Sequence, residues 1–92
     1  MPADFVIHNQ PLSYESRLDA RTLDSVDLVV IHCTELPDLA TAREYGERIR
    51  YETTRTGNSG HYYIDTDGSV HRYVAPERIA NHTYRYNAHT IG

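Results

Sequence analysis

Residues 26–34, Val-Asp-Leu-Val-Val-Ile-His-Cys-Thr, constrain the fold more than any other segment of this 92-residue chain. Apolar side chains occupy both alternating sets of positions, with Leu28 and Val30 on one side and Val29 and Ile31 on the other. A strand that is apolar on both sides is typical of a mixed or parallel sheet covered by helices. The sequence therefore predicts an α/β (α+β) domain whose mixed central β-sheet is flanked by helices, with this segment as the central strand.

A helix is predicted to follow this strand. It begins near residues 38–42, where either Asp38 or a capping box of Thr41 and Glu44 would satisfy the first free amides. Apolar residues then recur at helical spacing, and we expect the helix to run to about Tyr51.

A β-hairpin is predicted over residues 61–65 and 69–74, about the Asp-Gly pair at 67–68. In a hairpin with a two-residue loop, directly opposed residues have opposite parity, which places His61 and His71 on opposite faces. We therefore expect that these two histidines do not bind one metal ion together, unless a bulge shifts the register.

Length and composition limit the possible functions. The chain is long enough for one domain, over residues 1–92. Its net charge of -4 argues against general nucleic-acid binding, which needs a basic face. The start of the chain lacks the basic and apolar segments of a secretory signal, and no apolar run would span a bilayer, so we expect a cytoplasmic protein without a membrane partner.

His32 is the first candidate for chemistry. It lies at the carboxyl end of the predicted strand, where ligands gather in open α/β sheets, although a buried, hydrogen-bonded histidine would have the same pattern. Cys33 should point to the opposite face and pack as a small buried hydrophobic residue without contacting a metal. His82 and His89 lie in loop-like sequence, and no pair of histidines has a strong zinc-site spacing.

Several segments, in order, resemble the N-acetylmuramoyl-L-alanine amidase family, which includes bacterial muropeptide amidases, phage amidases and peptidoglycan recognition proteins. The matching segments are residues 29–34, 57–65 with 67–68, 72–74, 78–82, 86–87 and 90–92. The resemblance covers most of the chain from residue 26 onward. It implies a zinc-containing groove and hydrolysis of the amide between N-acetylmuramic acid and L-alanine in peptidoglycan or muropeptides.

The same resemblance assigns roles to individual residues. His32 matches the first zinc ligand of the family, whose zinc polarises the carbonyl and lowers the pKa of its bound water. His61, His82 and Asn87 are expected near the groove as substrate contacts. The catalytic residues cannot be assigned from the match.

The sequence also departs from the family pattern. The second and third zinc ligands of the family come from a C-terminal segment of Gly-His and Asp-Pro-Gly type, and no such segment is present. Some phage relatives place a catalytic tyrosine where this chain has Gly60, and many bacterial members have another residue in place of Asn81. We therefore expect the chain to be the N-terminal portion of a zinc amidase domain, truncated at its C-terminus and inactive alone. A peptidoglycan-binding module without catalysis and a truncated product of an interrupted gene are the alternatives.

Overall fold

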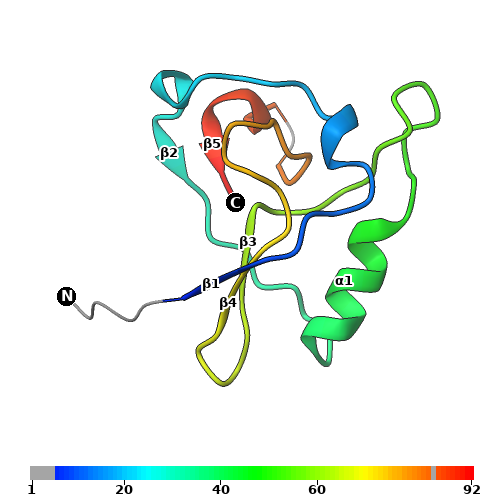
Figure 1. The fold of residues 1–92 in the computed structure, drawn as a ribbon, viewed down its shortest axis with the longest axis vertical. Helices are drawn as coiled ribbons and strands as arrows, with labels where there is room; N and C mark the ends of the chain where they lie inside the picture. The colour runs from blue at the N-terminus through cyan, green and yellow to red at the C-terminus, as the bar shows by residue number, and fades with distance from the viewer. Residues whose placement is uncertain (1–5, 84) are drawn as a thin grey trace.

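The computed structural model describes residues 6–83 and 85–92 (Figure 1). The described residues contain one α-helix, α1 (Leu39–Glu47), and three short 3-10 helices at Glu15–Arg17, Leu23–Ser25 and Asn87–His89. The strands are β1 (Ile7–Asn9), β2 (Leu28–Val29), β3 (Tyr62–Ile64), β4 (Val70–Arg72) and β5 (Thr90–Ile91). They form a mixed three-stranded sheet in the order β1-β4-β3 and a parallel pair, β2-β5. The predicted α+β class with mixed strands is confirmed.

The hairpin of β3 and β4 forms where the sequence predicts it, but in another register. Ile64 lies opposite Val70, so residues 65–69 form the loop and opposed residues share the same parity. Gly68, at a φ of 86°, and the Asp67 carboxylate, which accepts a hydrogen bond from the Ser69 amide, shape this longer loop. The parity argument that separated His61 from His71 is therefore wrong.

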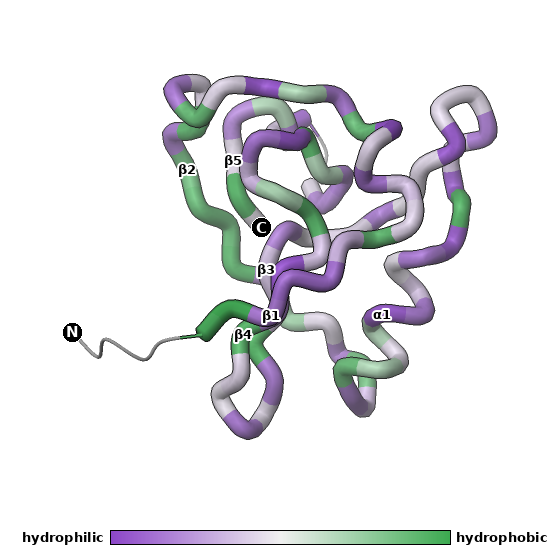
Figure 2. The backbone as a smooth tube through the Cα atoms, viewed as in Figure 1, coloured by the Kyte–Doolittle hydropathy of each residue, from purple (hydrophilic) through white to green (hydrophobic). Residues whose placement is uncertain are grey.

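The predicted central strand is short and lies away from the core. β2 contains only Leu28 and Val29 and pairs with β5 alone, outside the larger sheet. Val29 is 67% exposed and Ile31 is 93% exposed. The expectation of burial on both faces is wrong, because Leu28, on the opposite face of β2 from Val29, is also 47% exposed. Figure 2 shows this apolar segment running along the outside of the molecule.

Helix α1 begins at the alternative cap. The Asp38 carboxylate accepts hydrogen bonds from the Thr41 amide at 2.8 Å and from the Thr41 hydroxyl at 2.6 Å, so the capping box of Thr41 and Glu44 does not form. The helix ends at Glu47, earlier than predicted, because Tyr51 pairs instead with Thr56 in an isolated β-bridge. No helix among the described residues is long and apolar enough to cross a membrane.

The core lies between the larger sheet, the N-terminal segment and α1. Its buried side chains are Leu12, Tyr14, Leu18, Tyr73, Val74 and Ala80. The hydroxyl of Tyr14, a fully buried residue, donates a 2.6 Å hydrogen bond to the Gly46 carbonyl and ties α1 to the N-terminal segment. Gly57 allows the chain to return close to α1, since a Cβ at that position would lie 2.0 Å from the Arg48 carbonyl oxygen. These contacts hold the loop that leads into the hairpin.

Candidate functional site

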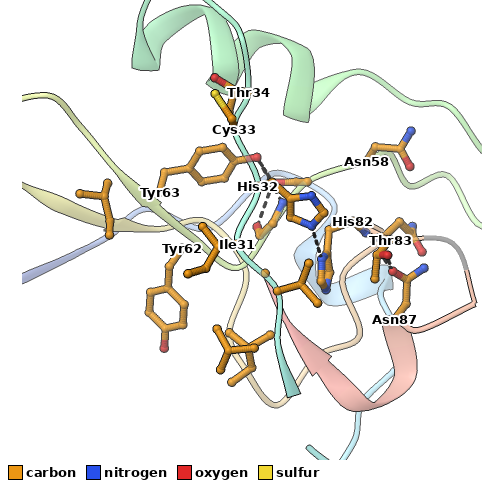
Figure 3. Close-up of a pocket in the computed structure, with 18 of the residues that line it drawn as sticks. Ile31, His32, Cys33, Thr34, Asn58, Tyr62, Tyr63, His82, Thr83 and Asn87 are labelled. Carbon is orange, nitrogen blue, oxygen red and sulfur yellow. Dashed lines mark hydrogen bonds between the residues drawn. The ribbon is translucent and has the colours of Figure 1, made fainter. Parts of the chain in front are cut away.

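A groove of about 1020 Å³ lies between the segment that follows β2, the residues around β3 and the loop that precedes β5 (Figure 3). Polar side chains, among them Asn58, His82 and Asn87, lie on one side of the view in Figure 3, and Ile31 and Tyr62 lie on the other. The remaining lining residues are Val29, Val30, His32, Cys33, Thr34, Tyr51, Ser59, Gly60, Tyr63, Ile64, Asn81, Thr83, Ile91 and Gly92. The groove therefore presents both apolar surface and hydrogen-bonding groups to a ligand.

His32 and His82 meet in this groove. The Nε2 atom of His32 lies 3.0 Å from the Nδ1 atom of His82, and the two rings meet edge to face at 86°. His32 is exposed and His82 is partly buried. The predictions that His32 points into the groove and that His82 lies near it agree with this placement.

Thr90 determines which nitrogen of His82 faces His32. The Thr90 hydroxyl donates a hydrogen bond to the Tyr86 carbonyl at 2.9 Å, so it accepts from Nε2 of His82 at 2.8 Å. Neutral His82 therefore carries its proton on Nε2 and directs the Nδ1 lone pair at His32. His32 in turn donates through Nε2.

The surroundings of His82 favour its neutral form. Burial, followed by the neighbouring imidazoles of His61 and His32 and the charge of Arg21, lowers the pKa of His82 from 6.5 to about 4. At neutral pH the His82 ring is therefore an uncharged acceptor at Nδ1 and a donor at Nε2.

Asn87 supports the same loop through its side chain. Its Oδ1 atom accepts hydrogen bonds from the amides of His82 at 3.0 Å and Thr83 at 2.8 Å. No described residue accepts a hydrogen bond from Nδ2 of Asn87, which lines the groove. Asn87 therefore positions His82 and leaves two N–H donors for a ligand.

His61 lies behind the groove and not on its wall. It is fully buried, and its ring centroid is 5.7 Å from that of His82. Its Nδ1 atom accepts from the Gly92 amide at 3.2 Å, so Nε2 carries the proton and donates to the Arg78 carbonyl at 2.8 Å. Burial and the nearby Arg21 lower the pKa of His61. This placement favours a supporting role for His61 over direct contact with substrate.

Comparison with known proteins gives one match. The family model of N-acetylmuramoyl-L-alanine amidase matches residues 22–92, a span that includes the entire groove. The chain belongs to the N-acetylmuramoyl-L-alanine amidase family. Searches of curated proteins and of solved structures found no match. Members of this family hydrolyse peptidoglycan, so a peptidoglycan-type substrate follows for the family as a whole.

The described residues do not form a complete zinc site. His32 and His82 bring two imidazole nitrogens together, a common ligand type for zinc. Among residues 6–83 and 85–92, no group of three or more His, Cys, Asp or Glu side chains is placed to hold a metal ion. A catalytic zinc normally has three protein ligands, so the described residues fill two positions at most.

Cys33 differs from its prediction. It is exposed and lines the groove together with His32, so the expectation of a small buried hydrophobic residue is wrong. Alternation between opposite faces applies to a continuous strand, and β2 ends at Val29, before these two residues.

The other histidines lie outside the groove lining. His8 and His71 stack on each other across β1 and β4, with ring centroids 4.9 Å apart. His89 lies 2.6 Å from the Asp27 carboxylate.

Sequence reasoning missed Asn58 and Tyr51 as groove residues and Thr90 as the hydrogen-bond partner of His82. Thr90 is fully buried beside His82, and the Tyr51 hydroxyl donates a hydrogen bond to Oδ1 of Asn58 at 2.7 Å. The family resemblance at residues 90–92 includes Thr90, but no sequence pattern indicated that Thr90 contacts His82.

Proposed function

We propose that this chain supplies the substrate groove and one zinc ligand, His32, of a zinc-dependent N-acetylmuramoyl-L-alanine amidase. The observation that carries the proposal is the pairing of His32 with His82 at 3.0 Å in the large groove of a chain that belongs to this family. The reaction is hydrolysis of the amide between N-acetylmuramic acid and L-alanine in peptidoglycan or muropeptides.

The two sides of the groove suit the two parts of such a substrate. Ile31 and Tyr62 offer apolar surface to the methyl groups of a stem peptide, while the side-chain amides of Asn58 and Asn87 offer hydrogen bonds to its carbonyls. A zinc ion held at His32 would polarise the scissile carbonyl. His82, neutral and fixed by Thr90, keeps the polar end of the groove ordered around that position.

The small number of candidate metal ligands among the described residues supports the proposal that the 92-residue chain alone binds zinc weakly and hydrolyses no muropeptide. A catalytic site needs three ligands braced by further hydrogen bonds, and the described residues place at most two. A metal held by so few ligands exchanges readily into a chelator.

A second candidate function is a peptidoglycan-binding module without catalysis. It is favoured by the contrast between a well-formed groove and the absence of a three-ligand cluster among the described residues. The reading frame after codon 92 discriminates between the two: in-frame Gly-His and Asp-Pro-Gly segments support the enzyme, and their absence supports the binding module.

Muropeptide binding tests the part that both candidates share. Isothermal titration calorimetry of the chain with an N-acetylmuramoyl peptide should show binding that weakens at least about tenfold in Asn87→Ala and His82→Ala, the loss expected when buried polar contacts are removed. His89→Ala, outside the groove lining, is the matched control and should bind as the unmodified chain does. Equal binding by all four proteins would refute the assignment of the groove as the substrate site.

A further inference from the structure

A second, smaller pocket of about 420 Å³ lies beside the groove, at the loop that follows α1 (Figure 1). Tyr51 and Asn81 line both the groove and this pocket, so the two share a wall. Arg17 and Asp19 also line the pocket, and both precede residues 22–92, the span that the family model matches. The volume lies within the range of about 300–1,000 Å³ that small-molecule sites occupy. The pocket is therefore a candidate site that the family match does not explain.

The loop that forms this pocket is fixed by contacts at both of its ends. Tyr51 and Thr56 pair in an isolated β-bridge, and the Oγ1 atoms of Thr54 and Thr56 lie 2.8 Å apart. From the N-terminal segment, Nε of Arg17 donates a hydrogen bond to the Arg55 carbonyl at 2.9 Å. The pocket is thus formed before any ligand binds, which lowers the entropy cost of binding.

The polar groups that line the pocket keep hydrogen-bonding capacity for a ligand. Among the described residues, no partner contacts the terminal nitrogens of Arg17, the carboxylate of Asp19 or the hydroxyl of Thr53. Arg17 and Asp19 form no ion pair with each other, although both line the pocket. Asn81 uses its Nδ2 atom for hydrogen bonds within the protein and keeps Oδ1 as an acceptor.

The combination of apolar and polar surface suits a sugar ring. Leu18, Ile79 and the ring of Tyr51, a residue that is 46% exposed, supply apolar surface. A pyranose has apolar C–H faces and hydroxyl groups around its edge, and each hydroxyl both donates and accepts hydrogen bonds. Arg17 offers donors, Asp19 offers acceptors, and the threonine hydroxyls offer either.

The presence of both Arg17 and Asp19 argues against a charged ligand. An anion attracted by Arg17 would be repelled by Asp19, and a cation would meet the reverse. A zwitterion such as a free amino acid would gain little, because both side chains are exposed and ion pairs at exposed positions are weakened by water and salt. It would also leave the apolar surface of the pocket uncovered. A neutral polyhydroxyl compound uses all of these groups.

We propose that this pocket binds a neutral pyranose, the N-acetylglucosamine unit linked to the N-acetylmuramic acid whose amide lies in the groove. The inference rests on the proposed function for the identity of the glycan. The Tyr51 hydroxyl donates a hydrogen bond to Asn58, so the pocket adjoins the polar side of the groove. A substrate that carries both sugars would therefore occupy the groove and the pocket together, and the domain would prefer it to a muramyl peptide without the second sugar.

Isothermal titration calorimetry with muramyl dipeptide and with its N-acetylglucosaminyl form tests the proposal. We expect the disaccharide form to bind at least about tenfold more tightly, and Asp19→Ala and Thr53→Val each to reduce this gain at least about threefold, as expected for lost hydrogen bonds. Neither substitution should change the affinity for muramyl dipeptide. Glu52→Ala, in the same loop but outside both linings, is the matched control and should keep the full gain. Circular dichroism checks the fold of each variant.

The other outcomes separate this inference from the proposed function. A disaccharide form that binds no more tightly than muramyl dipeptide would refute the sugar site and leave the groove assignment in place. A folded Asp19→Ala variant that loses affinity for both ligands equally would also refute a separate sugar site. If the intact chain binds neither ligand, both inferences are overturned. Amide signals of Thr53 and Thr54 that shift with L-alanine and not with N-acetylglucosamine would reassign the pocket to a zwitterion.

Discussion

Removal of the Thr90 hydroxyl should destabilise the fold through His82. Thr90→Val keeps the shape of this fully buried side chain but removes the hydrogen bonds of 2.8 Å to His82 and 2.9 Å to Tyr86. Each buried hydrogen bond contributes about 1 kcal/mol net, and a buried donor left without a partner costs about 1–3 kcal/mol. Because the Tyr86 carbonyl can be hydrated and the new methyl group gains some burial, we expect a loss of about 1–2 kcal/mol in the free energy of unfolding.

A double-mutant cycle isolates the contact with His82. Urea unfolding followed by far-ultraviolet circular dichroism would be measured for Thr90→Val, His82→Ala and the double variant. We expect a coupling energy of about 1 kcal/mol, since the two residues share one hydrogen bond. Thr56→Val, at another buried threonine, is the control and should show no coupling to His82. A coupling below about 0.3 kcal/mol for Thr90 would refute the argument that this hydroxyl fixes His82.

Three further outcomes follow from the fold and the site. Tyr14→Phe should cost about 1–3 kcal/mol in urea unfolding, because a buried carbonyl at the end of α1 loses its hydrogen-bond donor. Gly57→Ala should cost more than about 2 kcal/mol and lower the thermal midpoint, since the added Cβ would lie 2.0 Å from the Arg48 carbonyl; an unchanged midpoint would contradict the close approach. Stability should fall as pH drops from 6.5 toward 4, because unfolded histidine takes up a proton in this range while His82, with a pKa of about 4, resists it. After allowance for solvent screening, this contribution is about 1–2 kcal/mol, measured as the part of the pH dependence of urea midpoints that disappears in His82→Ala.

The local elements were predictable because short-range signals determine them. An Asp-Gly pair specifies a turn, and the hairpin strands appear on either side of residues 67–68. Asp38 was one of two possible caps, and it is the residue that accepts the Thr41 amide. The hairpin register was not predictable from the turn pair alone, because the loop includes Asp65 and Ser69, whose backbone groups are hydrogen-bonded to each other.

Burial and the contacts between residues far apart in the sequence were harder to predict from the sequence. The apolar pattern of residues 26–34 would be the same for a covered strand and for the exposed one that the structure shows, so the pattern could not determine burial. His32 and His82 are 50 residues apart in sequence, and no spacing rule brings such a pair together. Family resemblance placed both near one groove. Their direct contact, and the role of Thr90 in it, required coordinates.

The measurement that tests the central claim most directly is a two-dimensional ¹H–¹⁵N NMR titration of the chain with muramyl dipeptide in the presence of Zn²⁺. If the groove is the substrate site of this amidase domain, the amide signals of groove residues such as Tyr62, His82 and Asn87 should shift in a saturable manner. The His8–His71 pair lies outside the groove lining, and its signals should stay in place. Saturable shifts confined to residues outside the groove, or no shifts at millimolar ligand, would contradict the account.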